Sequence, residues 1–258
     1  MTLAGMWPRI RRTWKSGAVG VMGWLALGAP VAEARDYLVN QSYDTTEKGE
    51  FEVESFNDMN FSEADNDDSY NSKHQVEVEY GLLDHLQLAY YEVYAWDRSE
   101  DWARDELKIE AKLRLFEAGQ LPVDVAFYTE YSNPNGSQDT HSDAIENKVI
   151  LSKNLGPWNL VANAIFERDI NEHSNWEFEY TAGVSYEVRP TMRLGLELKE
   201  TLGDEEEFGV RRADHALQLV PGLYANLSPH VRLLAGVAFG VTRAADDVQL
   251  KSILEWEF

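Results

Sequence analysis

Segments in which apolar and polar residues alternate recur along most of this chain, and this repeat constrains the fold more than any other feature. Residues 248–258 show it well: aliphatic or aromatic residues take alternate positions up to Phe258, and Ser252 and Ile253 are the two breaks. A repeat of two residues is typical of a β-strand with one apolar and one polar face. The pattern therefore predicts an all-β protein.

Twelve such segments predict twelve strands, joined closely enough in sequence to form an up-and-down antiparallel meander. Pro221 lies inside one of them, and because proline cannot donate a backbone hydrogen bond, we expect a β-bulge there. The segments are residues 50–54, 74–80, 86–94, 107–115, 123–131, 145–151, 158–166, 176–188, 192–198, 215–227, 231–239 and 248–258.

The connections between these segments alternate in length. Those that follow even-numbered segments are short, at residues 81–85, 117–121, 154–157, 189–191 and 228–230. Those that follow odd-numbered segments are mostly longer, as at residues 58–73, 96–106, 132–144 and 201–214. Short turns at one end and longer loops at the other are typical of barrels that span the bacterial outer membrane. A soluble sandwich has no physical reason to sort its loops in this way.

A repeat of two does not by itself say which face of the sheet lies inside. A soluble barrel turns its apolar face inward, whereas a membrane barrel turns that face toward lipid. A twelve-stranded cylinder is too wide to be filled by one apolar side chain at every second position. Closure also removes the exposed edges of the sheet. We therefore expect a closed, up-and-down antiparallel transmembrane β-barrel of about 12 strands.

Composition excludes several other classes of protein. The chain has 258 residues, no cysteine and a formal charge of −22. Without cysteine there is no disulfide and no thiolate metal site. The acidic balance argues against nucleic acid as a partner, because phosphates would repel the chain. Beyond the N-terminus, no apolar run reaches the roughly 18 residues that a membrane-spanning helix requires.

The N-terminus has the three parts of a secretory signal peptide. A basic segment precedes an apolar stretch at residues 18–29, and an A-x-A cleavage sequence follows at residues 32–34. We expect a signal peptide over residues 1–34, a periplasmic lead-in over residues 35–48 and the transmembrane barrel over residues 49–258. The basic residues are Arg9, Arg11, Arg12 and Lys15.

Two stretches carry a resemblance to a known family. Residues 46–54 and residues 76–88, which include the hairpin sequence EYGLLDHLQL, resemble an uncharacterised family of Gram-negative outer-membrane β-barrels. They are similar to the transporter-like barrels named after a phenol-degradation pathway, and such barrels commonly end on an aromatic residue, as this chain does at Phe258. The resemblance implies the fold and a place in the bacterial outer membrane. It implies little about a substrate, and it transfers no catalytic residues.

If the apolar rows face lipid, the charged rows between them line the lumen. An acidic lumen would attract a small cationic solute, so we expect a channel or facilitator. The alternative is a non-conducting structural or binding barrel, because buried carboxylates without water must be paired, and a network of ion pairs would plug the lumen. The candidate lumen residues are Glu50, Glu52, Glu54, Glu77, Glu79, Lys108, Glu110, Lys112, Arg114, Glu130, Glu177 and Glu179.

A lipid hydrolase is a more distant alternative, because some outer-membrane barrels with twelve strands are lipases. That chemistry requires a serine and a histidine held by a third polar group. None of the six histidines lies in a recognisable nucleophile motif, so no enzyme activity is expected. No cofactor and no metal site is assigned.

The expected partners follow from the membrane assignment. They are outer-membrane lipid and lipopolysaccharide, a small solute of unknown identity, and the barrel-assembly machinery through the strand that ends in Phe258. The acidic stretches at residues 63–68 and 204–207 are expected in solvated outer loops, where divalent ions could bridge them to lipopolysaccharide.

Overall fold

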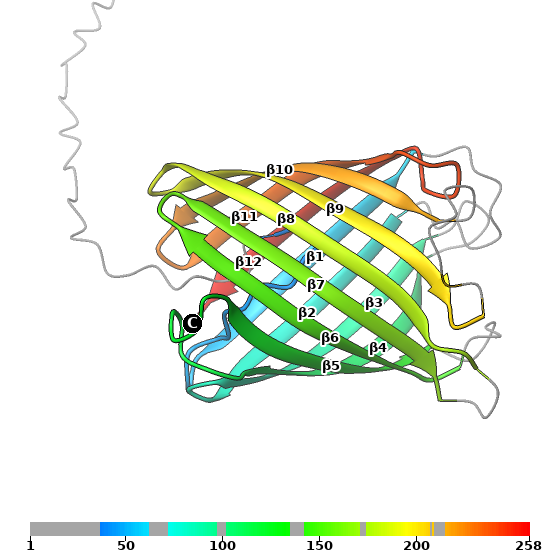
Figure 1. Ribbon diagram of the computed structural model, residues 1–258, viewed down its shortest axis with the longest axis horizontal. Helices are drawn as coiled ribbons and strands as arrows, with labels where there is room; N and C mark the ends of the chain where they lie inside the picture. Colours follow the sequence, from blue (N-terminus) through cyan, green and yellow to red (C-terminus); the bar gives the residue numbers. More distant parts are fainter. Residues whose placement is uncertain are drawn as a thin grey trace, which may run out of the picture. The chain divides into compact units, whose positions relative to one another are not determined.

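The computed structural model describes residues 37–61, 72–96, 102–134, 142–170, 174–206, 208 and 215–258. The signal peptide expected over residues 1–34 and the acidic stretch at residues 63–68 lie outside this part of the chain. The described residues form twelve antiparallel strands that close into a barrel, as the sequence predicts (Figure 1). No helix in the described ranges is long and apolar enough to cross a membrane.

Nine of the twelve strands are longer than the alternating segments that predict them, one is equal in length, and two are one residue shorter. The strands are β1 (Phe51–Asn60), β2 (Ser72–Leu83), β3 (Leu86–Trp96), β4 (Ala103–Arg114), β5 (Asp124–Pro134), β6 (Ala144–Leu155), β7 (Trp158–Asp169), β8 (Glu177–Arg189), β9 (Met192–Asp204), β10 (Leu217–Ser228), β11 (Val231–Gly240) and β12 (Val248–Glu257).

Every strand pairs with the strands before and after it in sequence, and β1 pairs with β12 to close the barrel. In the closing pair, Glu54 lies opposite Glu255, and the backbone N–H of Phe258 donates to the carbonyl oxygen of Phe51 at 2.9 Å. Closure leaves no unpaired edge among the twelve described strands, and such an edge in lipid would cost several kcal/mol for each unsatisfied backbone group.

The short connections gather at one end of the barrel, together with the C-terminus (Figure 1). We call this the short-turn end and the opposite one the long-loop end. One tight turn, between β6 and β7, contains Gly156 with a φ of 61°, a left-handed conformation that glycine adopts without strain.

The bulge expected at Pro221 is absent. Pro221 lies opposite Leu196 in unbroken register with β9, and the irregularity between β10 and β11 falls between Asn226 and Ser228. Proline lacks only its own N–H, so one hydrogen bond of the ladder is lost while the register on both sides continues.

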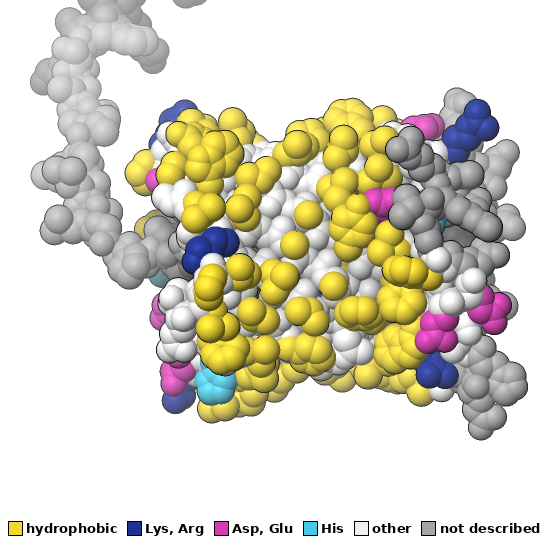
Figure 2. Space-filling view, in the orientation of Figure 1, with side chains coloured by type: hydrophobic (Ala, Val, Ile, Leu, Met, Phe, Trp, Pro, Cys, Tyr) yellow, Lys and Arg dark blue, Asp and Glu magenta, His cyan; other side chains and the backbone are white. Residues whose placement is uncertain are grey.

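The strands turn their apolar face outward, as the volume argument predicts. On β4, Ile109 is 53% exposed, whereas its neighbour Glu110 is 1% exposed and points into the barrel. Figure 2 shows apolar side chains over the middle of the visible outer face and charged side chains toward its two ends. A largely apolar outer surface around buried carboxylates is stable in lipid and not in water.

Aromatic side chains pair near both ends of the barrel. At the short-turn end, the ring centroids of Trp158 and Tyr186 lie 4.7 Å apart, and those of Phe51 and Tyr80 lie 4.6 Å apart. At the long-loop end, Phe166 meets Phe178 edge to face, with centroids 5.8 Å apart. Aromatic residues are enriched at the two interfaces of a membrane, and this arrangement agrees with a barrel that crosses one.

Candidate functional site in the barrel lumen

The N-terminal segment, residues 37–46, lies inside the barrel. Tyr37 is fully buried, Leu38 and Tyr43 are nearly so, and all three contact side chains that point inward from the strands. The expectation of a periplasmic lead-in over residues 35–48 is therefore wrong for this segment. The physical reason is that the segment carries apolar and hydrogen-bonding groups that complement the inner wall.

The strongest attachment of this segment is to Glu197 on β9. The Glu197 carboxylate accepts three consecutive backbone N–H groups, from Leu38 at 2.7 Å, Val39 at 2.8 Å and Asn40 at 3.1 Å. It also accepts the side-chain amide of Asn40 and the hydroxyl of Tyr224, both at 2.8 Å. Successive N–H groups that converge on one anion form a nest, and hydrogen bonds to a charged acceptor are about twice as strong as neutral ones.

The wall is shaped to receive the first side chains of the segment. The Tyr37 hydroxyl donates to Asn159 Oδ1 at 2.5 Å. A Cβ atom at Gly183 would lie 2.8 Å from the Tyr37 ring, and one at Gly236 would lie 2.4 Å from Leu38 Cδ1. Any larger residue at these two positions would meet the N-terminal segment, so glycine creates the space that the segment fills.

An apolar cluster fills the centre of the lumen around these contacts. It includes Ile253, one of the two breaks in the alternation of the last strand, which points inward and is buried. The lumen is therefore not a continuous acidic bore at this level, because inward apolar side chains and the N-terminal segment occupy it. The cluster comprises Tyr37, Leu38, Tyr43, Ala126, Tyr128, Ile150, Val161, Val220, Tyr224, Leu234, Ala238 and Ile253.

The segment remains attached to the wall as it approaches the short-turn end. The Tyr43 hydroxyl donates to the carbonyl oxygen of Phe116. The backbone N–H of Thr46 donates to Gln87 Oε1 at 2.9 Å, and its hydroxyl donates to Glu79 Oε2 at 2.7 Å. The segment is thus held at its start, middle and end.

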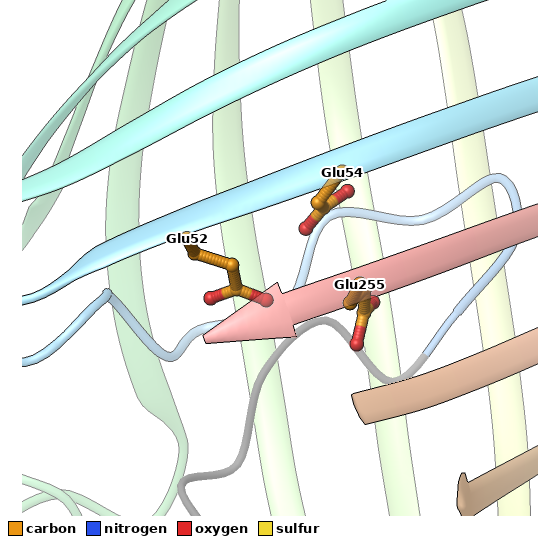
Figure 3. Close-up of side chains that lie close together, drawn as sticks. All are labelled: Glu52, Glu54 and Glu255. Carbon is orange, nitrogen blue, oxygen red and sulfur yellow. The ribbon is translucent and has the colours of Figure 1, made fainter. Parts of the chain in front are cut away.

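Five buried glutamates gather in the lumen beside the last part of the segment, and the Thr46 hydroxyl contacts one of them, Glu79. They lie on three neighbouring strands, and the antiparallel register sets Glu54 opposite both Glu77 and Glu255 and sets Glu52 opposite Glu79. Figure 3 shows Glu52 and Glu54 on β1 beside Glu255 on β12. We call Glu52, Glu54, Glu77, Glu79 and Glu255 the carboxylate cluster.

Among the described residues, cationic side chains neighbour the carboxylate cluster. Arg232 Nη1 lies 3.7 Å from Glu255 Oε2, and Lys112 is close enough to act on Glu52 electrostatically. Identical charges set directly opposite each other across a strand pair are destabilising, and this cluster contains three such pairs.

A polar cavity of about 430 Å³ occupies the other half of the lumen, toward the long-loop end. The segment Leu38–Gln41 forms part of its lining. Lysines in its wall are held by acids: Lys108 lies 2.9 Å from Glu130 and Lys251 lies 2.6 Å from Asp58. Further pairs of the lumen wall join Lys148 to Glu146 at 2.8 Å and Lys199 to Glu179 at 3.0 Å.

The N-terminal segment separates the predicted lumen residues into two groups. Glu52, Glu54, Glu77, Glu79 and Lys112 lie toward the short-turn end, whereas Lys108, Glu130 and Glu179 lie toward the long-loop end. Glu110 is buried and accepts the Tyr91 hydroxyl.

Three predicted lumen residues lie at the rims. Glu50 is half-buried just before β1, at the short-turn end. Arg114, at the same end, lies with its guanidinium 5.8 Å from the centre of the Tyr43 ring and donates to the carbonyl oxygen of Asp84. Glu177 is exposed at the long-loop end of β8, so it lines the rim rather than the interior.

The alternation of apolar and polar residues does not indicate that the N-terminal segment belongs to the site, because residues 37–46 carry no repeat. One signal was present in the sequence. Glycines stand at inward positions of neighbouring strands, at Gly183, Gly195, Gly222 and Gly236, where a water-filled lumen would not require them. They indicate that other atoms approach the wall closely.

Comparisons with known proteins bear on the fold. No protein-family model matches the chain, and no curated protein matches its sequence. Among solved structures, the KdgM porin matches with a TM-score of 0.59 at 8% identity, over 80% of this chain and 99% of that one. The chain has the outer-membrane porin fold.

Two further solved structures agree. The COG4313 outer membrane channel from Pseudomonas putida F1 matches with a TM-score of 0.56 at 14% identity, over 84% of this chain and 98% of that one. The NanC porin matches with a TM-score of 0.55 at 9% identity, over 81% and 98%. Identities this low show the shared fold alone. Together with the apolar outer surface, the fold places this protein in the bacterial outer membrane.

Proposed function

We propose that this protein is an outer-membrane channel for a small polar solute, and that its N-terminal segment holds the lumen closed. The proposal rests on the specific binding of that segment to the inner wall. Glu197 accepts three consecutive backbone N–H groups, and Gly183 and Gly236 leave room for Tyr37 and Leu38. Passage of a solute requires the segment to dissociate from the inner wall.

The polar cavity supports a channel rather than a solid barrel. About 430 Å³ of space lined by charged and amide side chains has no structural use in a barrel that only needs to stay folded. Lysines in its wall form ion pairs with Glu130 and Glu146, so it would accept a solute that carries charged or hydrogen-bonding groups. The carboxylate cluster at the other end would then favour cations, because rings of acidic side chains select for them.

A non-conducting barrel is the second candidate, and a specific observation favours it. The apolar cluster and the N-terminal segment fill the centre of the lumen, and ion pairs such as Lys148–Glu146 line the remaining space. This candidate predicts that no current flows even when the segment is displaced. We do not propose a lipid hydrolase, because the three solved structures described above are named as porins and a channel.

Two narrower assignments remain proposals. The resemblance of residues 46–54 and 76–88 to the barrels named after a phenol-degradation pathway supports membership of that family. Contacts with lipopolysaccharide and with the barrel-assembly machinery through Phe258 are inferred from the membrane assignment.

Single-channel recording in planar bilayers tests the function. We expect the refolded wild-type protein to be closed for most of the time, and we expect Glu197→Gln to open more often because it removes the charge that binds residues 38–40. Glu92→Gln is the matched control, since it removes the same charge from the outward face of β3, near the long-loop end.

Selectivity is measured in the same recordings. An open channel that prefers cations, and loses part of that preference in Glu77→Gln, supports the proposed solute class. If neither the wild type, nor Glu197→Gln, nor a variant that lacks residues 37–45 passes current, the channel proposal fails and the non-conducting barrel stands.

A further inference from the structure

We propose that the carboxylate cluster is a binding site for one divalent cation, with calcium as the ion that fits it best. The inference does not rest on the channel proposal, because the site is complete in the closed barrel. It concerns the side chains on β1, β2 and β12 near the short-turn end.

The first observation is geometric. One carboxylate oxygen each from Glu52, Glu54 and Glu255 lies within 4.8 Å of the others, and the same holds for Glu54, Glu77 and Glu79. Calcium binds oxygen at about 2.3–2.6 Å, so two ligands on opposite sides of one ion are separated by about 5 Å. A single ion can therefore contact all the carboxylates of either group, and Glu54 belongs to both.

The second observation concerns Glu52 alone. Its side chain is 5% exposed, and its Oε1 atom has no hydrogen-bond partner among the described residues. Figure 3 shows its carboxylate beside those of Glu54 and Glu255. A buried carboxylate oxygen without a donor is costly unless a cation or a proton satisfies it, and here it points at further negative groups.

The electrostatic surroundings of the cluster also favour a cation. Among the described residues, Lys112 acts electrostatically on Glu52, and Arg232 Nη1 lies 3.7 Å from Glu255 Oε2. The protein carries formal charge −22 overall, so the surrounding field also attracts cations. At the short-turn end, Glu47 is exposed and Glu50 and Glu257 are half-buried, so further acidic side chains lie close to the cluster.

The ligand set identifies the class of ion. Carboxylate oxygens alone suit hard cations such as calcium, magnesium and manganese. Magnesium demands near-ideal octahedral geometry at about 2.0–2.1 Å, whereas calcium accepts six to eight oxygens in irregular arrangements. The carboxylates come from three adjacent strands whose backbone positions the barrel fixes, and such a ligand set suits the irregular coordination of calcium better than a strict octahedron.

Titration calorimetry with calcium chloride on the refolded full chain in detergent, after metal removal, tests the proposal. We expect the wild type to bind calcium more tightly than magnesium. We expect Glu54→Gln to weaken the binding by roughly tenfold or more, because calcium affinity follows the number of charged ligands. Glu187→Gln is the matched control, since this exposed glutamate lies at the same end of the barrel and outside the cluster.

Thermal unfolding, followed by circular dichroism at constant ionic strength, gives an independent readout. Calcium should raise the melting temperature of the wild type and of Glu187→Gln, and should leave that of Glu54→Gln unchanged. Glu54→Gln should melt above the calcium-free wild type, because it removes a charge from a repulsive row. If Glu54→Gln does not refold, Glu255→Gln takes its place in both measurements.

Two results would overturn the inference. One is equal calcium binding by the wild type and Glu54→Gln, which would assign the binding to other acidic groups of the chain. The other is a wild-type melting temperature that calcium does not move, which would mean that protons or basic side chains balance the cluster. Neither result depends on conductance. A barrel that passes no current but binds calcium would contradict the channel proposal and leave the calcium site intact.

Discussion

The ring of Tyr37 occupies the space that a side chain at Gly183 would need, since a methyl group there would lie 2.8 Å from Tyr37 Cε1. The two residues are far apart in sequence, and the contact forms only when the N-terminal segment enters the barrel. It makes the closed lumen a specific packed state rather than a loose obstruction, and it can be tested without altering the outer wall.

The variant Gly183→Ala should displace the N-terminal segment from the inner wall while leaving the barrel folded. Overpacking of this kind costs about 1–3 kcal/mol, and here the nearest atoms belong to the side chains of Tyr37 and Val161 rather than to the backbone. We expect longer open times in bilayer recordings and faster proteolysis within residues 37–46. In a Tyr37→Ala background the same substitution should have little further effect, and additive effects would contradict the contact.

Hydrogen–deuterium exchange measures the Glu197 nest directly. In Glu197→Gln, the backbone amides of Leu38, Val39 and Asn40 should exchange faster, because hydrogen bonds to a charged acceptor contribute about 1.5–3 kcal/mol and neutral ones less. Amides of the strand pair β5–β6 should not change. Unaltered protection at residues 38–40 would show that the segment is held by other contacts.

A positive charge on the outer wall tests the orientation of the sheet. Ile109 is 53% exposed near the middle of β4, and Ile109→Arg should destabilise the barrel in liposomes by about 2–4 kcal/mol, as expected for arginine near the bilayer midplane. Leu82→Arg, at the short-turn end of β2, should cost about 0–1 kcal/mol. Equal free energies of unfolding for the two variants in urea titrations would mean that this wall does not face lipid.

Asp143, just before β6, provides a pH-dependent contact at the long-loop end. The Tyr131 hydroxyl at 2.7 Å and the Asn133 amide at 2.6 Å donate to its carboxylate and hold the Asp143 pKa below its ordinary value. A pKa that is lowered by folding stabilises the folded state at neutral pH, and this contribution is lost as the pH falls through the lowered pKa.

An NMR titration of the Asp143 carboxyl carbon checks this directly. The midpoint should lie below that of aspartate in an unfolded peptide, and Tyr131→Phe should raise it, because the hydroxyl is the main cause of the shift. A midpoint that does not respond to Tyr131→Phe would remove the proposed cause.

The sequence determined the barrel because its information is local. Alternation along each strand placed Ile109 outside and Glu110 inside, and the order of short and long connections fixed the meander before any contact between distant residues was known. The same alternation placed Glu52, Glu54, Glu77 and Glu79 on the inner face. A register that is one residue out would reverse every side chain, so the pattern admits one solution.

Only the tertiary structure decided how the lumen is filled. Residues 37–46 have no repeat, and their place depends on Glu197, Gly183 and Gly236, which are distant in sequence and become neighbours only when the barrel closes. Glu255 likewise joins Glu54 only through the pairing of the first strand with the last. Sequence periodicity specifies which way a side chain points, whereas the group that it meets across a closed cylinder depends on the complete fold.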